Sequence, residues 1–306
     1  MRLSTRPKGN RSKKHHYLPR HYLRGFVDSG NCFFLYDKLN DKILPNPLTP
    51  DAAFFENNLN TVFFPMGGSS DYLENLYALI ENESWGPLDN IRNSTNKTKI
   101  RLLDKMRLFL FLLFLHWRLP GNIKYVEELS KDFFVADNDL CFFTLKSKSG
   151  ENVPKEVLDL VRNSAAFKKS SKLMLPFAPF YDGNWSERIE KWRFLYTGDS
   201  ANWYLVGDNP IITKGDNDHD PVNCLNEFVF PVSGRILLVN TDQPIKRDMP
   251  PEFVVQVNVS IIERAQRFAA CQNRDFLEAL TKYYRGYVNF KRTDVIISDM
   301  FDMLKQ

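Results

Sequence analysis

The sequence has few cysteines, and none of them are close neighbours. Cys32, Cys141, Cys224 and Cys271 form no CxxC pair in a chain of 306 residues. A zinc site built on paired thiolates is therefore disfavoured. Isolated cysteines are typical of reduced thiols, and no apolar stretch follows the N-terminus as it does in a secretory signal. We therefore expect a cytoplasmic protein.

The chain also lacks a hydrophobic run long enough to cross a membrane. Its strongest apolar run, residues 108–115, has eight residues and is bounded by Arg107 and His116. A membrane-spanning helix needs about twenty. The run therefore predicts a buried helix, which we place at 99–119, and it predicts no membrane partner.

Several catalytic motifs are missing as well. The sequence contains no Walker A loop, no GxGxxG, no HExxH and no GxSxG. These absences disfavour ATP hydrolysis, dinucleotide binding of the Rossmann type, zincin protease activity and esterase activity. The composition, with 43% hydrophobic and 25% charged residues, indicates a globular protein and points to no particular reaction.

Acidic residues are absent from the first 24 positions, where eight lysines and arginines lie. The rest of the chain holds 33 basic and 37 acidic side chains, so the net charge of +4 is a property of the N-terminus. We expect residues 1–14 to form a flexible basic arm. Such an arm can bind the phosphates of a nucleic acid, or it can be a solvated leader without a partner. The basic residues are Arg2, Arg6, Lys8, Arg11, Lys13, Lys14, Arg20 and Arg24.

The order of local patterns predicts an α+β fold with short, mostly antiparallel strands. A strand pair is followed by helices, then strands, then helices, which differs from the alternation of a doubly wound sheet. We expect residues 15–306 to form one compact unit around the helix at 99–119, with a sub-boundary near 146–152 as an alternative. The expected strands are 31–36, 42–44, 140–145, 191–197, 203–206, 227–230 and 235–239. Residues 45–70 are expected to be a loop. The first expected helix begins at 71 and is limited or kinked at Gly86-Pro87. The further expected helices are 99–119, 122–134, 154–174, 259–271 and 275–284.

Short motifs follow one another along the chain in a distinctive order. The densest is His15-His16-Tyr17-Leu18-Pro19, with Tyr22-Leu23 and Phe26 after it; the later ones are Tyr72-Leu73-Glu74, Arg118-Leu119-Pro120, Asp208-Asn209-Pro210 and Phe230-Pro231-Val232-Ser233. This set resembles DUF4238, a family of domains of unknown function, over roughly residues 13–275. His21 departs from the aromatic or aliphatic residue expected at its position. The resemblance implies which positions matter, and it implies no reaction.

His15 and His16 are candidates for a general base or a metal ligand. Adjacent side chains diverge by about 100° on a helix and by about 180° on a strand, so the two do not readily share one metal ion. A structural alternative stays open, in which one histidine belongs to a hydrogen-bond network and the other is exposed.

Glu74 and Glu81 are seven residues apart on one face of an expected helix, with Asp71 one turn earlier. Two carboxylates at this spacing can hold a divalent cation or position a base. The alternative is a solvated edge beside the apolar stripe. The candidate metal ligands are His16, Glu81 and Asp208, and the identity of a metal cofactor stays open.

Arg118 ends the apolar helix, where a buried charge must be paired. Asp104 and Arg107 are expected to form such an internal pair. Arg118 can instead project into a polar site and bind a phosphate or carboxylate through two hydrogen bonds. Asp208 and Asn209 follow an apolar strand, where they can activate water or hold a metal, although Asx residues before proline are also ordinary turn formers.

These candidates lead to two main hypotheses of function, beside a third option in which every motif builds the core and function lies in surface loops. The first is a nucleic-acid-directed, nuclease-like hydrolase, which by analogy with small bacterial-type proteins fits a role in defence against phage. The second is a non-catalytic module that binds nucleic acid or protein and uses the same motifs structurally. The first hypothesis predicts that His16→Ala and Asp208→Ala abolish activity and leave stability nearly intact. It also predicts one cleft lined by His15 or His16, Glu74 or Glu81, Arg118 and Asp208.

Overall fold

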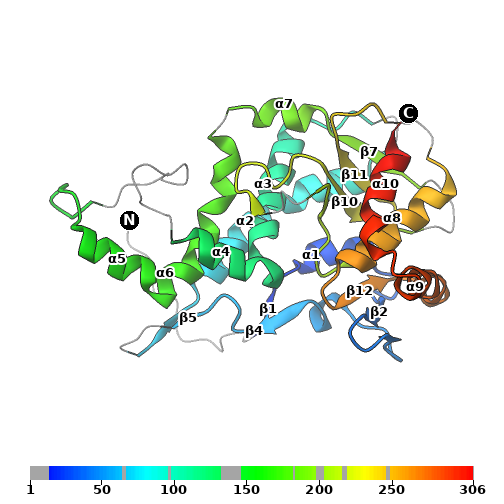
Figure 1. The fold of residues 1–306 in the computed structure, drawn as a ribbon, viewed down its shortest axis with the longest axis horizontal. Helices are drawn as coiled ribbons and strands as arrows, with labels where there is room; N and C mark the ends of the chain where they lie inside the picture. The colour runs from blue at the N-terminus through cyan, green and yellow to red at the C-terminus, as the bar shows by residue number, and fades with distance from the viewer. Residues whose placement is uncertain are drawn as a thin grey trace.

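The computed structural model describes most of the chain (Figure 1). The described residues are 14–63, 67–95, 98–131, 146–181, 183–197, 203–215, 219–245 and 249–305. The predicted mobile arm lies outside them except for Lys14, and so do the predicted strand at 140–145 and Cys141.

Two four-stranded antiparallel sheets form the β part of the fold. The first has the order β7 (Arg193–Tyr196), β11 (Ile236–Asn240), β10 (Phe228–Ser233), β9 (Ile212–Thr213). The second has the order β3 (Lys42–Ile43), β2 (Phe34–Asp37), β12 (Phe268–Cys271), β8 (Val206–Gly207). The predicted α+β class with short antiparallel strands is confirmed, and so is the pairing of the first two predicted strands.

Three short strands lie in the region 45–70 that the sequence predicted to be a loop: β4 (Phe55–Asn57), β5 (Val62–Phe63) and β6 (Ser69–Ser70). β5 pairs with β6, and β4 pairs with β1 (Lys14–His16) from the start of the described chain. The histidine motif itself supplies β1, which places His15 opposite Glu56. Because β1 is 39 residues before β4, no local pattern predicted this pairing. The extended backbone sends the side chains of His15 and His16 to opposite faces.

The predicted central helix is confirmed as α3 (Leu102–Arg118), in which nearly every residue after Arg107 is buried. It packs along α2 (Tyr72–Arg92). Pro87 was expected to end or kink α2, yet the helix runs through it to Arg92. Pro87 is buried, and packing against α3 stabilises the turns on both sides of it.

The other helices and turns that precede β7 in the sequence are short. The helices are α1 (Arg20–Leu23), α4 (Ile123–Leu129), α5 (Lys155–Asn163), α6 (Ala165–Ser170) and α7 (Trp185–Glu190). The 3₁₀ turns are Arg24–Phe26, Pro50–Ala52, Pro120–Asn122, Ser171–Leu173 and Leu175–Phe180. In Figure 1, α5 projects at the side opposite to the C-terminal helices, and none of its residues is buried. The predicted helix at 154–174 is therefore two helices and a 3₁₀ turn.

The C-terminal part consists of α8 (Pro251–Arg264), α9 (Arg274–Asn289), a 3₁₀ turn (Thr293–Val295) and α10 (Ile296–Leu304). The prediction of a helix over 259–271 is wrong beyond Arg264. Ala265 leaves the helix with φ −61° and ψ 133°, and β12 then pairs with both β2 and β8. Pairing with two neighbouring strands outweighs the helix propensity of the alanines in β12.

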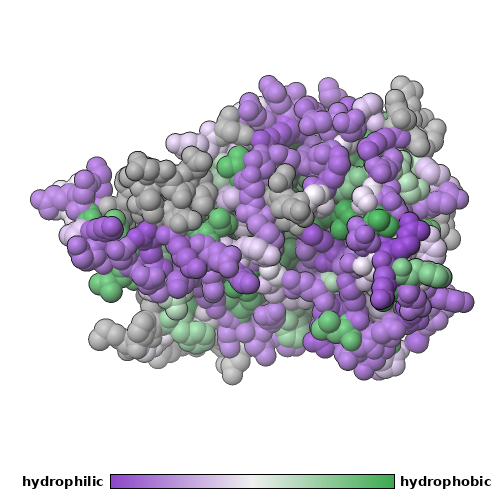
Figure 2. Space-filling model, viewed as in Figure 1, coloured by the Kyte–Doolittle hydropathy of each residue, from purple (hydrophilic) through white to green (hydrophobic). Residues whose placement is uncertain are grey.

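The first sheet lies between two hydrophobic cores. Along β10, Phe228 and Phe230 join the core around α3, whereas Val229 joins the core beneath α8 and α10. Leu237 and Leu238 of β11 alternate in the same way. Both faces of this sheet are therefore covered by helices. No helix in the described ranges is long and apolar enough to span a bilayer, and the face in Figure 2 is mostly hydrophilic with small separate apolar patches.

Candidate functional site

His15 is buried in β1 and accepts a hydrogen bond from a backbone amide. Its Nδ1 lies 2.9 Å from the Asn60 backbone nitrogen, and its side chain is 2% exposed. An Nδ1 that accepts a hydrogen bond carries no proton, so the neutral ring carries its proton on Nε2. The same Nδ1 lies 3.8 Å from Oε2 of Glu74. The structure thus brings together one predicted histidine and one predicted carboxylate.

Asn60 connects three segments at this point, and it is fully buried. Its backbone N–H donates to His15, and its side-chain amide donates to Oε2 of Glu74 at 2.7 Å. Its side-chain carbonyl accepts a hydrogen bond from Nζ of Lys172 at 2.5 Å. Asn60 therefore fixes the positions of His15, Glu74 and Lys172 relative to one another. We call these four residues the Asn60 cluster.

Arg118 is buried and joins β1 to α2. Its Nε donates to the Tyr17 carbonyl at 2.9 Å, its Nη1 donates to Oε1 of Glu81 at 2.6 Å, and its Nη2 donates to the His16 carbonyl. The guanidinium also lies over the ring of Tyr77, 4.8 Å from its centre. All three guanidinium nitrogens are thus engaged within the protein, which gives Arg118 a positioning role in this conformation.

The other members of the predicted set near β1 have distinct surroundings. His16 is partly buried, and its Nε2 finds no hydrogen-bond partner among the described residues. Burial, helped by the charge of Arg20, lowers the pKa of His16 below its usual value. The imidazole is therefore neutral near pH 7. Asp104, expected to pair with Arg107, pairs instead with Arg101 at 2.9 Å.

Asp208 lies in a different hydrogen-bond network. Its carboxylate accepts backbone hydrogen bonds from Gln266 at 2.8 Å, Arg267 at 2.8 Å and Phe268 at 2.9 Å. Burial raises the pKa of the Asp208 carboxyl above its usual value, while these three donors oppose the shift. The side chain thereby ties the end of β8 to the start of β12.

Asp208 and Asn209 are not hydrogen-bonded to the Asn60 cluster. Asn209 lines a separate polar cavity of about 300 Å³ together with Asn122, Arg264 and Gln266. The charge of Asp208 still helps to raise the pKa of the Tyr17 hydroxyl, after burial as the main cause. The two networks are therefore neighbours. The structure joins His15 to Glu74, and Arg118 to Glu81, through direct contacts.

A cavity of about 660 Å³ adjoins the Asn60 cluster, and Lys172 belongs to both. Its lining includes Lys168 and Lys169, and also Glu56 and Glu127. Lys169 donates to the carbonyls of Asn58 at 3.2 Å and Thr61 at 2.7 Å. We call this cavity the lysine pocket.

Lys172 has an unusual protonation equilibrium for a lysine. It is 3% exposed, and burial lowers its pKa from 10.5 to about 7. The charges of Lys169 and Arg118 lower the pKa further, whereas Glu74 and Glu56 oppose the shift. Near neutral pH, Lys172 therefore has a much larger neutral fraction than an exposed lysine.

Within the described ranges, no three His, Cys, Asp or Glu side chains gather closely enough to hold a metal ion. The predicted ligand set of His16, Glu81 and Asp208 is thus not assembled into such a group. Instead, Glu81 binds Arg118 and Asp208 binds backbone amides.

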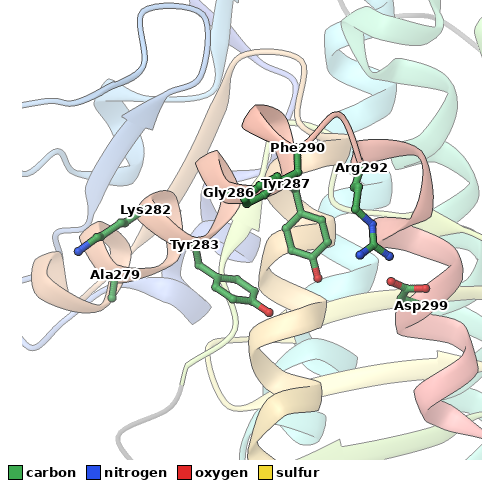
Figure 3. Close-up of a pocket in the computed structure, with 8 residues that line it drawn as sticks. All are labelled: Ala279, Lys282, Tyr283, Gly286, Tyr287, Phe290, Arg292 and Asp299. Atoms are coloured by element: carbon green, nitrogen blue, oxygen red, sulfur yellow. The ribbon is translucent and has the colours of Figure 1, made fainter.

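Another cavity, of about 600 Å³, lies on the C-terminal helices and contains none of the predicted site residues (Figure 3). Tyr283, Tyr287 and Phe290 of α9 and the following turn give it an aromatic wall. Arg292 and Asp299 face each other at its edge in Figure 3. It is separate from the lysine pocket, with which it shares no lining residue.

Sequence reasoning missed Asn60 and Lys172. Asn60 lies in the region expected to be a loop, and Lys172 ends the run Lys168-Lys169-Ser170-Ser171-Lys172, which is typical of a solvated surface. The spacing of Lys168 and Lys172 by four residues places them on one side of the chain. That spacing was the only local signal, because burial of Lys172 depends on segments far away in the sequence, among them Asn60 and Tyr77.

Comparison with known proteins gives a family and no activity. No curated protein and no solved structure matches the chain. The family model DUF4238, described as a protein of unknown function, matches residues 14–275. The matched range includes the histidine motif, Arg118, Asp208 and the lysine pocket, and it ends before the aromatic cavity on α9. The chain therefore belongs to the DUF4238 family.

Proposed function

We propose that this DUF4238 protein acts on nucleic acid and binds its phosphates in the lysine pocket. The observation that carries the proposal is the presence of Lys168, Lys169 and Lys172, three lysines from five consecutive positions, in the lining of one cavity. Lysines that neutralise phosphates are the main source of affinity for nucleic acid.

The size and charge of the pocket suit a single-stranded ligand. A volume of about 660 Å³ is in the range that holds a small molecule or a nucleotide. Three lysines line it against the two carboxylates Glu56 and Glu127. A single-stranded end or an unpaired nucleotide therefore fits better than an intact duplex.

In this proposal the family motifs position the pocket and do not contact the ligand. Lys172 is held by Asn60, which is held in turn by His15 and Glu74. Arg118 fastens the same strand, β1, to α2 through Glu81. These contacts favour a binding module whose histidine, glutamate and arginine residues are structural.

A hydrolytic, nuclease-like activity is a second candidate, and the state of Lys172 favours it. A general base works best when its pKa is close to the working pH, and the pKa of Lys172 is lowered to about 7. Its neutral amine can take a proton from an attacking water, while Lys168 stabilises the negative charge that develops. This candidate predicts cleavage of an intact oligonucleotide that is lost in Lys172→Gln.

The basic N-terminus supplies a further contact in the proposal. Arg20 pairs with Asp51 at 2.6 Å, and the Arg24 guanidinium lies 5.6 Å from the centre of the Trp85 ring. Neither residue lines the lysine pocket. The five basic residues of positions 1–13 are the ones that we assign to phosphate contacts outside the pocket.

Binding of a fluorescent single-stranded oligonucleotide, followed by anisotropy at several salt concentrations, tests the proposal. The double variant Lys168→Gln/Lys169→Gln is expected to bind about tenfold more weakly, with a salt slope reduced by about 1.4, since each contact to a single strand contributes about 0.7. The control Lys42→Gln/Lys99→Gln removes the same charge from exposed positions and should bind nearly as wild type. Equal losses in both variants, with equal melting temperatures, contradict a pocket-specific site.

A further inference from the structure

We propose that the amine of Lys172 forms an imine with a carbonyl group carried by a phosphate-bearing sugar. The source that fits the proposed function, on which this inference rests, is the ring-opened aldehyde of an abasic site in a nucleic acid. The protein is then a lyase that acts at such sites through its lysine and needs no attacking water for strand cleavage.

Lys172 combines deep burial with a place in the lining of a cavity. Lys172 is 3% exposed and lines the lysine pocket, and its Nζ donates a hydrogen bond to the side-chain carbonyl of Asn60. The hydrogen bond that the structure shows for its Nζ goes to the neutral amide oxygen of Asn60, while Glu74 and Glu56 act on the amine through their charge. The ring of Tyr77 lies 5.5 Å from Nζ and covers it on one side. The amine is thus shielded from bulk water and held by a neutral partner.

The protonation state supports this geometry. Only the neutral amine has the lone pair that attacks a carbonyl carbon. With its pKa lowered to about 7 by burial, Lys172 has a substantial population of neutral amine at pH 7. A lysine with the ordinary pKa of 10.5 is almost entirely protonated at that pH. Lys172 therefore offers far more neutral amine than an exposed lysine.

The reaction balances without an oxidant or a reductant. The Nζ lone pair forms a C–N bond to the aldehyde carbon, and the carbinolamine loses water to give a protonated imine. A base then removes the proton from the neighbouring carbon, and the electron pair expels the phosphate on the next carbon. Water finally hydrolyses the imine, which releases an unsaturated aldehyde and restores the lysine amine.

The other residues of the pocket have matching roles. Glu56 and Glu127 line the same cavity and supply carboxylates that can accept the carbon-bound proton. Lys168 and Lys169 offer positive charge to the phosphates on either side of the sugar. The pocket therefore contains a nucleophile, a base and phosphate binders, all within the described residues.

Trapping with sodium cyanoborohydride tests the inference, because the reagent reduces an imine to a stable amine. The full chain is incubated with an oligonucleotide that carries one abasic site, with an intact oligonucleotide, or with ribose 5-phosphate. Peptide mass spectrometry then locates the adduct. We expect a covalent adduct on Lys172 with the abasic oligonucleotide, about tenfold or more above that on any exposed lysine. We expect none with the intact oligonucleotide.

Two variants and a pH series sharpen the test. Lys172→Gln should abolish the adduct, whereas Lys42→Gln, at an exposed position, should leave it unchanged. Because adduct sites are mapped in the wild-type chain, the result does not depend on whether Lys172→Gln folds. The rate of trapping should rise with pH through about 7 and level off above it. Burial is the main cause of that low midpoint; the charges of Lys169 and Arg118 lower it further, and those of Glu74 and Glu56 oppose the shift.

The outcomes separate this inference from the proposed function. An adduct on Lys172 with ribose 5-phosphate but not with the abasic oligonucleotide supports imine formation by Lys172 and refutes a nucleic acid as the source of the aldehyde. Adducts spread evenly over exposed lysines, or none with either compound, overturn the inference. In that case oligonucleotide binding by the lysine pocket is still decided independently by the anisotropy measurement.

Discussion

Leu112→Asp is expected to leave the protein unfolded at 25 °C. Leu112 is completely buried in the middle of α3, the helix around which the larger hydrophobic core is built. An aspartate there has no partner, and burying an unpaired charge costs several kcal/mol. Domains are usually stable by only about 5–15 kcal/mol, so a loss of this size abolishes most of the folded population. Far-UV circular dichroism and urea unfolding measure the effect.

The same helix provides a matched control. Leu103 is 50% exposed in the first turn of α3, so Leu103→Asp introduces the same charge in contact with water. We expect this variant to unfold at nearly the wild-type urea concentration. If Leu112→Asp shows a cooperative transition close to that of Leu103→Asp, the central position of α3 in the core is wrong.

Asp208→Ala is expected to destabilise the protein strongly, on the order of 3 kcal/mol. The substitution leaves three backbone N–H groups, those of Gln266, Arg267 and Phe268, without their acceptor at the start of a central strand. A donor that loses its partner costs up to about 1–3 kcal/mol where water cannot replace the acceptor, and these three are partly buried. Asp208→Asn keeps one acceptor atom and should lose less. Urea unfolding of the two variants measures this order.

The control for Asp208 is Asp302, a carboxylate on the surface of α10 that pairs with Lys305. Asp302→Ala should change stability little, because surface ion pairs contribute little. The sequence led us to expect that Asp208→Ala leaves stability nearly intact, and the three hydrogen bonds now predict a loss of stability instead. His16→Ala should still leave stability nearly intact, since the Nε2 of His16 bonds to none of the described residues. If Asp208→Ala unfolds like wild type, the structural role of Asp208 is contradicted.

Features with a local cause could be predicted from the sequence. The helix α3 follows from an apolar run and its periodicity, and the β2–β3 hairpin follows from two short strands with a turn between them. β12 could not be predicted, because its strand conformation depends on β2 and β8, which are far away in the sequence.

The candidate site divides in the same way. The motif residues His15, Glu74 and Arg118 were recognisable as a set, and the structure places each of them in a network of direct contacts. Asn60 and Lys172 have no local signature. Their importance arises only when the fold brings a loop residue and a lysine 112 positions later within 2.5 Å of each other.

The central claim is that Lys172 is a buried amine with a lowered pKa in a basic pocket. The most direct test is a pH titration of its Nζ and adjacent carbon resonances by NMR on the full chain labelled with ¹³C and ¹⁵N lysine. Loss of one resonance in Lys172→Arg assigns the signal. We predict a midpoint at about pH 7. A midpoint near 10.5, the ordinary value for lysine, contradicts the account of the pocket.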